Sequence, residues 1–392
     1  MATIPRAALD FLSEQVTAIS ADAMAKVLEV LERVEWTPDN IAECREIVAA
    51  ALAAVLPTYT DVSAQAGADF YDACRELCVG EAMGAEALSG FDFASTYGAL
   101  RAIVQDVVDE KPIEQFNAKV LERVDREIRR AANVSVAENT RRDPLKPKYA
   151  RVPSGADTCS FCLMLASFGF NTGSREAAAH THANCDCRIV PQWGGDSVDG
   201  YDPDEMYGRY NVCLDAIGGR DGVRREWDAL PKDEREAYIA KHGGKAGKAF
   251  DAFLAKRVSA EIGRRDPEWF MTGKVPEAER RGMERFTIPE AKLTRYALCM
   301  ESERGRDKAI AFERALGFTD KDAAEIMRQV YRWVGEHEPK FRKTGEYGDA
   351  YTTEMVMVGK GGKTARVIVG WMKGMDEDKM RLTTIHVAKR KG

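Results

Sequence analysis

Candidate metal ligands gather in one short stretch of this chain. Between positions 159 and 187 lie four cysteines and two histidines, whereas the whole 392-residue chain holds nine cysteines and five histidines. They form the pattern Cys159-x-x-Cys162, then His180-x-His182-x-x-Cys185-x-Cys187. Thiolate sulfur and imidazole nitrogen are the ligands that zinc prefers, and a closed structural site uses four of them. A fold of this segment must therefore bring two separate turns of chain together around one ion.

Four of these residues are the first choice as ligands. A Cys-x-x-Cys turn supplies two ligands in a zinc knuckle, and His182-x-x-Cys185 has the tight spacing of a second half-site. We therefore predict a structural zinc ion bound by Cys159, Cys162, His182 and Cys185. A catalytic zinc would need an open coordination position and an acid–base carboxylate. Glu176 is the nearest glutamate, and the His-x-Glu signature of zinc deaminases is absent.

Two neighbouring residues offer alternative ligands. Cys187 could replace Cys185, and His180 could replace His182. Alternate residues of an extended strand point to opposite sides, so Cys185 and Cys187 would bind the same ion only if the chain curls.

The first 142 residues are predicted to form a long helical region. Leu9, Leu12, Val16 and Ile19 recur at three- and four-residue steps, which indicates one apolar helix face. We expect helices over residues 5–34, 38–57, 62–83, 97–108 and 112–142.

Prolines and a change in predicted secondary structure divide the rest of the chain. Asp143-Pro144 and Lys146-Pro147 indicate a linker, because a residue before proline avoids the helical region. A zinc-knuckle module is expected at 143–200 and a charged helical connector at 201–287. Residues 288–392 are predicted to form a small α+β domain, with helices followed by strands at 351–358, 364–372 and 381–388. The predicted fold class is mainly α, with a small antiparallel sheet near the C-terminal end.

Charge is unevenly distributed. The chain has 57 Lys and Arg against 63 Asp and Glu, but residues 288–392 hold 21 basic against 16 acidic residues. A basic module on an acidic body is compatible with a nucleic-acid partner, and a solvated basic surface gives the same count. In the helix after Pro112, four cations share a face. They allow either a solvated flank, with Glu122 and Asp125 as partners, or a contact with DNA or an acidic partner. They are Lys119, Arg123, Arg126 and Arg130.

Several spaced motifs around the cysteines agree with one protein family. The run from Arg151 to Gly169 reads RVPSGADTCSFCLMLASFG, and His182-Ala-Asn-Cys185-Asp-Cys187, Val190-Pro191 and Gly200-Tyr-Asp-Pro-Asp204 follow it. This pattern resembles the MuF-like head-morphogenesis proteins, which are minor head proteins of tailed phages. The resemblance covers about residues 139–212, and the doubled histidine departs from it.

That resemblance implies a structural role in a virion. Such proteins associate in few copies with the portal or the capsid interior, some enter the host with the DNA, and the head domain has no enzymatic activity. We therefore expect portal, capsid or scaffold proteins as partners, with DNA as a further candidate. The resemblance also implies that the protein is produced in the host cytoplasm and is located inside the capsid. The N-terminus lacks the pattern of a secretory signal, and no run of eighteen apolar residues predicts a membrane span.

The C-terminal part resembles a small domain found in phage proteins and polymorphic toxins. The matching segments are Lys292-Leu293, Tyr296-Ala-Leu298, Gly305-Arg-Asp-Lys308, Leu316-Gly-Phe-Thr319, Arg366-Val-Ile-Val-Gly-Trp371 and Arg381-Leu-Thr-Thr384. Small ribonuclease toxins also have helices followed by a sheet. This likeness is an analogy at the level of fold alone.

A metal-independent ribonuclease site in this domain would need an acid, a base and phosphate-binding cations. Period two places Leu382, Thr384 and His386 on one strand face, and Arg366 on the preceding strand could lie nearby. The candidate catalytic residues are therefore Arg366, Thr384 and His386, acting on host RNA. The competing interpretation is an ordinary half-exposed sheet.

Overall fold

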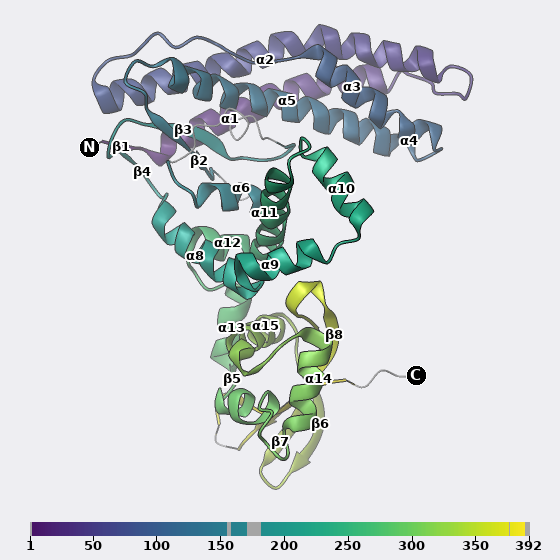
Figure 1. Cartoon of the computed structure of the whole chain (residues 1–392), viewed down its shortest axis with the longest axis vertical. Helices are drawn as coiled ribbons and strands as arrows, with labels where there is room; N and C mark the ends of the chain where they lie inside the picture. The colour runs from purple at the N-terminus through teal and green to yellow at the C-terminus, as the bar shows by residue number, and fades with distance from the viewer. Residues whose placement is uncertain (1, 155–157, 171–181, 376, 389–392) are drawn as a thin grey trace. The chain divides into compact units, whose positions relative to one another are not determined.

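The structure is a computed structural model of the whole chain and describes residues 2–154, 158–170, 182–375 and 377–388. The chain divides into two compact units (Figure 1). The first unit comprises residues 1–212 and 251–271, and the second comprises residues 213–250 and 272–392. Most elements are helices and one sheet lies near the C-terminal end, so the predicted fold class is confirmed.

Three long helices form the body of the first unit: α1 (Arg6–Leu31), α2 (Ile41–Val79) and α5 (Ile113–Arg142). They lie side by side in Figure 1. On α1 the predicted face of Leu9, Leu12 and Val16 is buried, so burial of one apolar stripe holds this helix in place. Helices α3 (Phe93–Ile103) and α4 (Gln105–Val108) connect α2 to α5.

The predicted helix break at Pro57 is wrong. Helix α2 continues through this proline, because its buried face includes Leu52 and Leu56 before it and Thr60 and Ala64 after it. Proline removes one backbone donor. The Thr60 hydroxyl contacts the local backbone by donating to the Leu56 carbonyl at 2.8 Å. Continuous burial of one helix face therefore outweighs the cost of the proline.

Helices α2 and α5 approach each other closely. A Cβ atom on Gly67 would lie 2.5 Å from the carbonyl oxygen of Ala132, so only glycine fits there. The Ser63 hydroxyl donates to the Ile128 carbonyl at 2.7 Å in the same interface. By length and composition α2 could also cross a membrane, with 39% of its most apolar window buried. The core helix of a bundle passes the same test, and α2 packs against α1 and α5.

The basic residues of α5 have acidic partners within the unit. Lys119 contacts Asp106 at 2.5 Å, and Arg123 contacts Glu127 at 3.0 Å. These partners differ from the expected Glu122 and Asp125, because Asp125 instead accepts from Arg129 at 2.8 Å. Arg130 also lies 3.8 Å from Glu127, so three of the four cations are neutralised locally, which favours the solvated-flank interpretation for them.

Short elements after α5 build a small module in the first unit. Strand β2 (Lys148–Val152) pairs antiparallel with β3 (Arg188–Gln192), and helix α6 (Ser160–Ala166) lies between them in sequence. Strand β1 (Thr3–Ile4) pairs parallel with β4 (Ser197–Val198). Helices α8 (Pro203–Ala216), α11 (Ala246–Arg265) and α12 (Pro267–Thr272) follow. Arg209 joins α8 to α12 by donating to the Phe270 carbonyl at 2.7 Å.

The second unit combines helices with a five-stranded sheet in the order β5-β9-β8-β7-β6. Its strands are β5 (Phe286–Thr287), β6 (Lys340–Gly345), β7 (Gly348–Val358), β8 (Thr364–Lys373) and β9 (Met380–Val387). Its helices are α9 (Gly219–Asp228), α10 (Lys232–Lys241), α13 (Glu277–Arg285), α14 (Arg306–Leu316) and α15 (Ala323–Glu336), with a π-helix η1 (Leu293–Ala297) and two short 3₁₀ turns, η2 (Asp320–Asp322) and η3 (Lys360–Gly362). The three predicted strands are confirmed as β7, β8 and β9. The sheet is mixed rather than purely antiparallel, because the two-residue strand β5 pairs parallel with β9.

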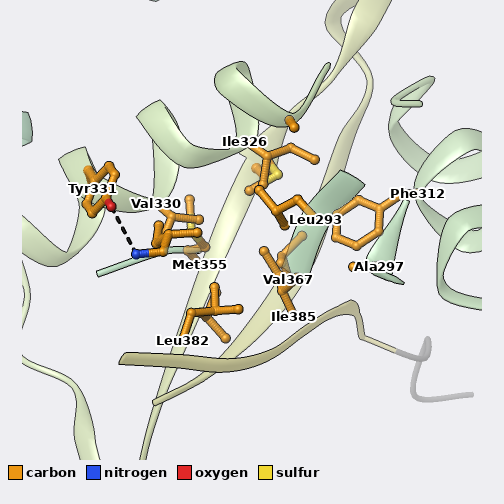
Figure 2. Close-up of a cluster of buried hydrophobic side chains, with 14 of the residues drawn as sticks. Leu293, Ala297, Phe312, Ile326, Val330, Tyr331, Met355, Val367, Leu382 and Ile385 are labelled. Carbon is orange, nitrogen blue, oxygen red and sulfur yellow. Dashed lines mark hydrogen bonds between the residues drawn. The ribbon is translucent and has the colours of Figure 1, made fainter. Parts of the chain in front are cut away.

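One apolar core joins the sheet of the second unit to its helices. Figure 2 shows Val367 and Ile385 from the sheet facing Phe312 and Ile326 from the helices. The Tyr331 hydroxyl adds a polar link by accepting from the backbone N–H of Ile288 at 3.0 Å. The core covers one face of the sheet and leaves Arg366 and Val356 exposed on the other.

Candidate metal centre

The structure brings the four first-choice ligands together. The ligand atoms of Cys159, Cys162, His182 and Cys185 all lie within 4.8 Å of one another. The Sγ atoms of Cys162 and Cys185 are 3.3 Å apart, and Cys159 Sγ lies 3.5 Å from His182 Nε2. Zinc–sulfur bonds of about 2.3 Å place two sulfurs of a tetrahedron roughly 3.8 Å apart, so this donor set fits a tetrahedral ion. His180 and Glu176 lie outside the described residues.

Local backbone structure positions each half of the site. Cys159 is the N-cap of α6, and its Sγ accepts from the backbone N–H of Cys162 at 3.4 Å. Asn184 has a left-handed φ of 59°, which turns the chain just before Cys185. A Cys-x-x-Cys turn at a helix start and a tight left-handed turn are compact geometries that hold the four ligands close.

Helix α5 anchors the second half-site through two hydrogen bonds. The Asp125 carboxylate accepts from the backbone N–H of Asn184 at 2.6 Å, and Asn133 Oδ1 accepts from the N–H of Ile189 at 3.1 Å. Both acceptors are buried. Because these bonds link positions more than fifty residues apart, the knuckle is fixed directly to the helical body.

Cys187 lies beside the four-ligand set. Its Sγ is 3.1 Å from Cys185 Sγ and 3.3 Å from Cys162 Sγ, so the chain does curl between Cys185 and Cys187. The Arg151 guanidinium donates to Cys187 Sγ at 2.7 Å and lies 3.9 Å from Cys162 Sγ. Arg151 is 3% exposed, and this buried cation offsets negative charge on the thiolates. Cys185 belongs to the group of four close ligand atoms and Arg151 contacts Cys187, so Cys185 stays the first candidate for the fourth ligand.

The cluster also shifts the protonation of its own members. Hydrogen bonds with Cys162 and Cys185 lower the pKa of the Cys159 thiol. Hydrogen bonds with Cys159 and Cys185 raise the pKa of His182 to about 10. Zinc binding would release protons from such a set, because the metal binds thiolate and neutral imidazole.

A second buried arginine lies next to the cluster. Arg188 is fully buried, and its Nη1 donates to the Cys187 carbonyl at 3.1 Å. Its Nε and Nη2 have no hydrogen-bond partner among the described residues. Burial lowers the pKa of Arg188 to about 10. Two buried cations so close to one cysteine cluster indicate a centre whose thiolates carry negative charge.

The C-terminal candidate residues are only partly assembled. Thr384 Oγ1 accepts from Lys308 Nζ at 2.7 Å, and burial, followed by the charge of Lys308, lowers the pKa of His386. Arg366 instead contacts Glu354 at 2.9 Å. His386 pairs with Ile368, and Thr384 pairs with Gly370. Both side chains therefore lie on the sheet face that carries Arg366.

The predicted common face of Leu382, Thr384 and His386 is wrong for Leu382. The pairing between β8 and β9 shifts register between Gly370 and Trp371, which opposes Thr384 to Gly370 and Leu382 to Trp371. This bulge turns Leu382 into the core with Ile385.

Two family models match separate parts of the chain. A family model described as VG15 protein matches residues 3–213, more than half of the chain, so this chain belongs to the VG15 family of viral proteins. A second model, a domain of unknown function named DUF6883, matches residues 280–389. No curated protein and no solved structure matches the chain. The cysteine cluster falls within the VG15 match, and the sheet falls within the second.

Proposed function

We propose that this viral protein is a minor head protein of a tailed phage, positioned near the portal inside the capsid. Its role is assembly rather than catalysis, with portal, capsid or scaffold proteins as partners. The observation that carries this proposal is the knuckle of Cys159, Cys162, His182 and Cys185, which lies within the VG15 match and is fixed to α5. The sequence resemblance to MuF-like proteins covers the same segment.

The donor set supports a structural ion. Four protein ligands fill a tetrahedral site and leave no coordination position for a substrate. Zinc bound there would connect α6, the turn before β3 and the body of the first unit. A structural ion of this kind suits a protein that acts through its shape and not through catalysis.

Purified virions provide the direct test. Quantitative mass spectrometry is expected to find this chain in a few copies per particle, together with zinc at about one ion per chain. Cys162→Ser should lower its incorporation, whereas Cys299→Ser, outside the cluster, should not. Absence of the chain from particles with normal portal content would overturn the proposal.

A second candidate function is an effector that enters the host and acts on RNA. It is favoured by the half-buried group of Lys308, Thr384 and His386 within the DUF6883 match. Induced expression of the full chain should then arrest host growth, and His386→Ala should relieve the arrest. His337→Ala is the matched control, because His337 is exposed and stacks on Trp333. Normal growth with the intact chain would count against this function.

A further inference from the structure

Strand β6 is an edge strand whose six residues are all exposed. It carries three cations, Lys340, Arg342 and Lys343, in a span of four residues. In the part of the chain that the structure describes, these three form no ion pair, whereas Lys360 and Arg366 each contact a carboxylate at 2.8–2.9 Å. The edge of the sheet is therefore a strip of uncompensated positive charge.

Exposed aromatic rings lie along the same strip. Phe341 is 56% exposed and packs edge-on against Tyr351 at 5.6 Å. Tyr347, in the turn between β6 and β7, is 76% exposed. Cations that alternate with accessible rings are typical of surfaces that bind single-stranded nucleic acid, where phosphates meet the charges and bases stack on the rings.

A pocket continues the strip beyond Tyr347. It has a volume of about 270 Å³, and its lining includes Tyr347, Lys292, Arg381, Thr383 and Glu377. Glu377 lies 3.9 Å from Arg381, so the pocket holds two cations and one carboxylate. Its size is slightly below the usual range of about 300–1,000 Å³ for ligand sites and suits a single base or a phosphate.

Cations on an edge strand also discourage pairing with other sheets. That role would not require accessible rings or an adjoining cationic pocket. The register shift between Phe341 and Lys343 is a bulge at Arg342, which re-aims side chains along the edge. The combination of charge, rings and pocket is better explained by an extended polyanion with unpaired bases.

We propose that β6, Tyr347 and the pocket of Lys292 and Arg381 bind a single-stranded polynucleotide. The phosphates contact Lys340, Arg342 and Lys343, and a base stacks on Tyr347. RNA and DNA share this chemistry, so binding to both is expected. This inference rests on the second unit alone and does not depend on the virion role proposed above.

Fluorescence anisotropy with the full chain tests the proposal. The probes are single strands of about twelve nucleotides, as RNA and as DNA, and a duplex of equal length. Changing Lys340, Arg342 and Lys343 together to Ala should weaken strand binding at least about tenfold. It should also reduce the slope of log affinity against log salt by about 2, since each phosphate contact in a single strand contributes roughly 0.7.

Matched variants separate this surface from general charge. Changing three other exposed cations of the same unit, Arg304, Arg314 and Lys321, to Ala should leave binding unchanged. Tyr347→Ala should weaken binding about tenfold by removing a stacking ring, whereas Tyr347→Phe keeps the ring and the affinity. Equal binding by the intact chain and the β6 triple variant, or tighter binding of the duplex than of the strand, would overturn the proposal.

Discussion

The surroundings of the candidate metal centre and the core of the C-terminal sheet are both buried, but their buried side chains differ in chemistry. Around the cysteines the buried side chains include charged and amide groups, among them Arg151, Arg188 and Asn133. The core of the second unit is apolar, with Phe312, Trp371 and their neighbours packed between sheet and helices.

The difference shows how a short, loop-rich segment can be fixed without a large apolar core. Residues 158–170 and 182–192 contain only two short regular elements, α6 and β3, and are too short to form a large core of their own. A metal ion supplies folding free energy directly, because the site does not exist in the unfolded chain. The sheet needs no such ion, since burial of apolar side chains contributes about 25 cal/mol per Å². The two regions should therefore respond to different perturbations.

Removal of the metal should have the largest effect. Chelation, or Cys162→Ser, should cost the module between β2 and β3 on the order of 10 kcal/mol. Hydrogen exchange of the full chain should then rise sharply at residues 148–152 and 188–192 but stay unchanged at 364–373. Cys299→Ser should alter neither region. Equal loss of protection in both regions would contradict the comparison.

Truncation of the apolar core should give the reverse pattern. Trp371 is 1% exposed, its ring lies 4.7 Å from Phe286, and its Nε1 donates to Thr353 at 3.0 Å. Trp371→Ala should cost about 3–5 kcal/mol of stability in the second unit. The measurement is chemical unfolding of the full chain together with its zinc content, which should not change. Trp371→Phe keeps much of the volume and should cost less, and a loss of zinc in either variant would link the two regions.

The sequence predicts which four candidate ligands come together because their spacing is local. Cys159 and Cys162 are held by one turn at a helix start, and His182 and Cys185 by another, so short motifs carry the geometry. The anchors Asp125, Asn133 and Arg151 could not be recognised in the same way. Asp125 and Asn133 act across more than fifty residues, and the only signal for them is that they are polar residues on an amphipathic helix. Arg151 opens the run that carries the family resemblance, but nothing in that run indicates its contact with Cys187.

The sheet was predicted where alternation is regular and missed where it is not. Strands β7 and β8 alternate buried and exposed residues, whereas β6 is exposed throughout and has no apolar period to detect. The bulge in β9 turns the Leu382 side chain to the other face of the sheet. A strict alternation of faces along the strand cannot predict this. In α2 the apolar pattern continues on both sides of Pro57, and burial of that face outweighs the tendency of proline to end a helix.

Acid should cause the smallest difference in stability between the two regions, because it acts through one buried carboxylate of the first unit. Asp143 follows α5, is fully buried and accepts hydrogen bonds from Tyr71, Arg75 and Trp193 at 2.9–3.0 Å. Burial alone would raise its pKa, but the Leu145 backbone N–H and these three side chains outweigh burial and lower the pKa. A lowered pKa means that the stabilisation is complete above the unfolded value of about 3.9 and is lost as pH falls through the folded value.

Asp143→Asn tests this directly because an amide does not ionise in this range. At pH 7 the variant should be less stable by about 1.5–3 kcal/mol, the contribution of a hydrogen bond to a charged group. The difference should shrink as pH falls below the unfolded value of about 3.9 and vanish once the native carboxyl is protonated too. Metal loss in acid affects both proteins alike and cancels in the difference. Asp378→Asn, at an exposed position of the second unit, should show no such dependence. A constant difference between the Asp143 variant and the native chain at all pH values would mean that the carboxylate charge does not stabilise the junction between α5 and the metal module.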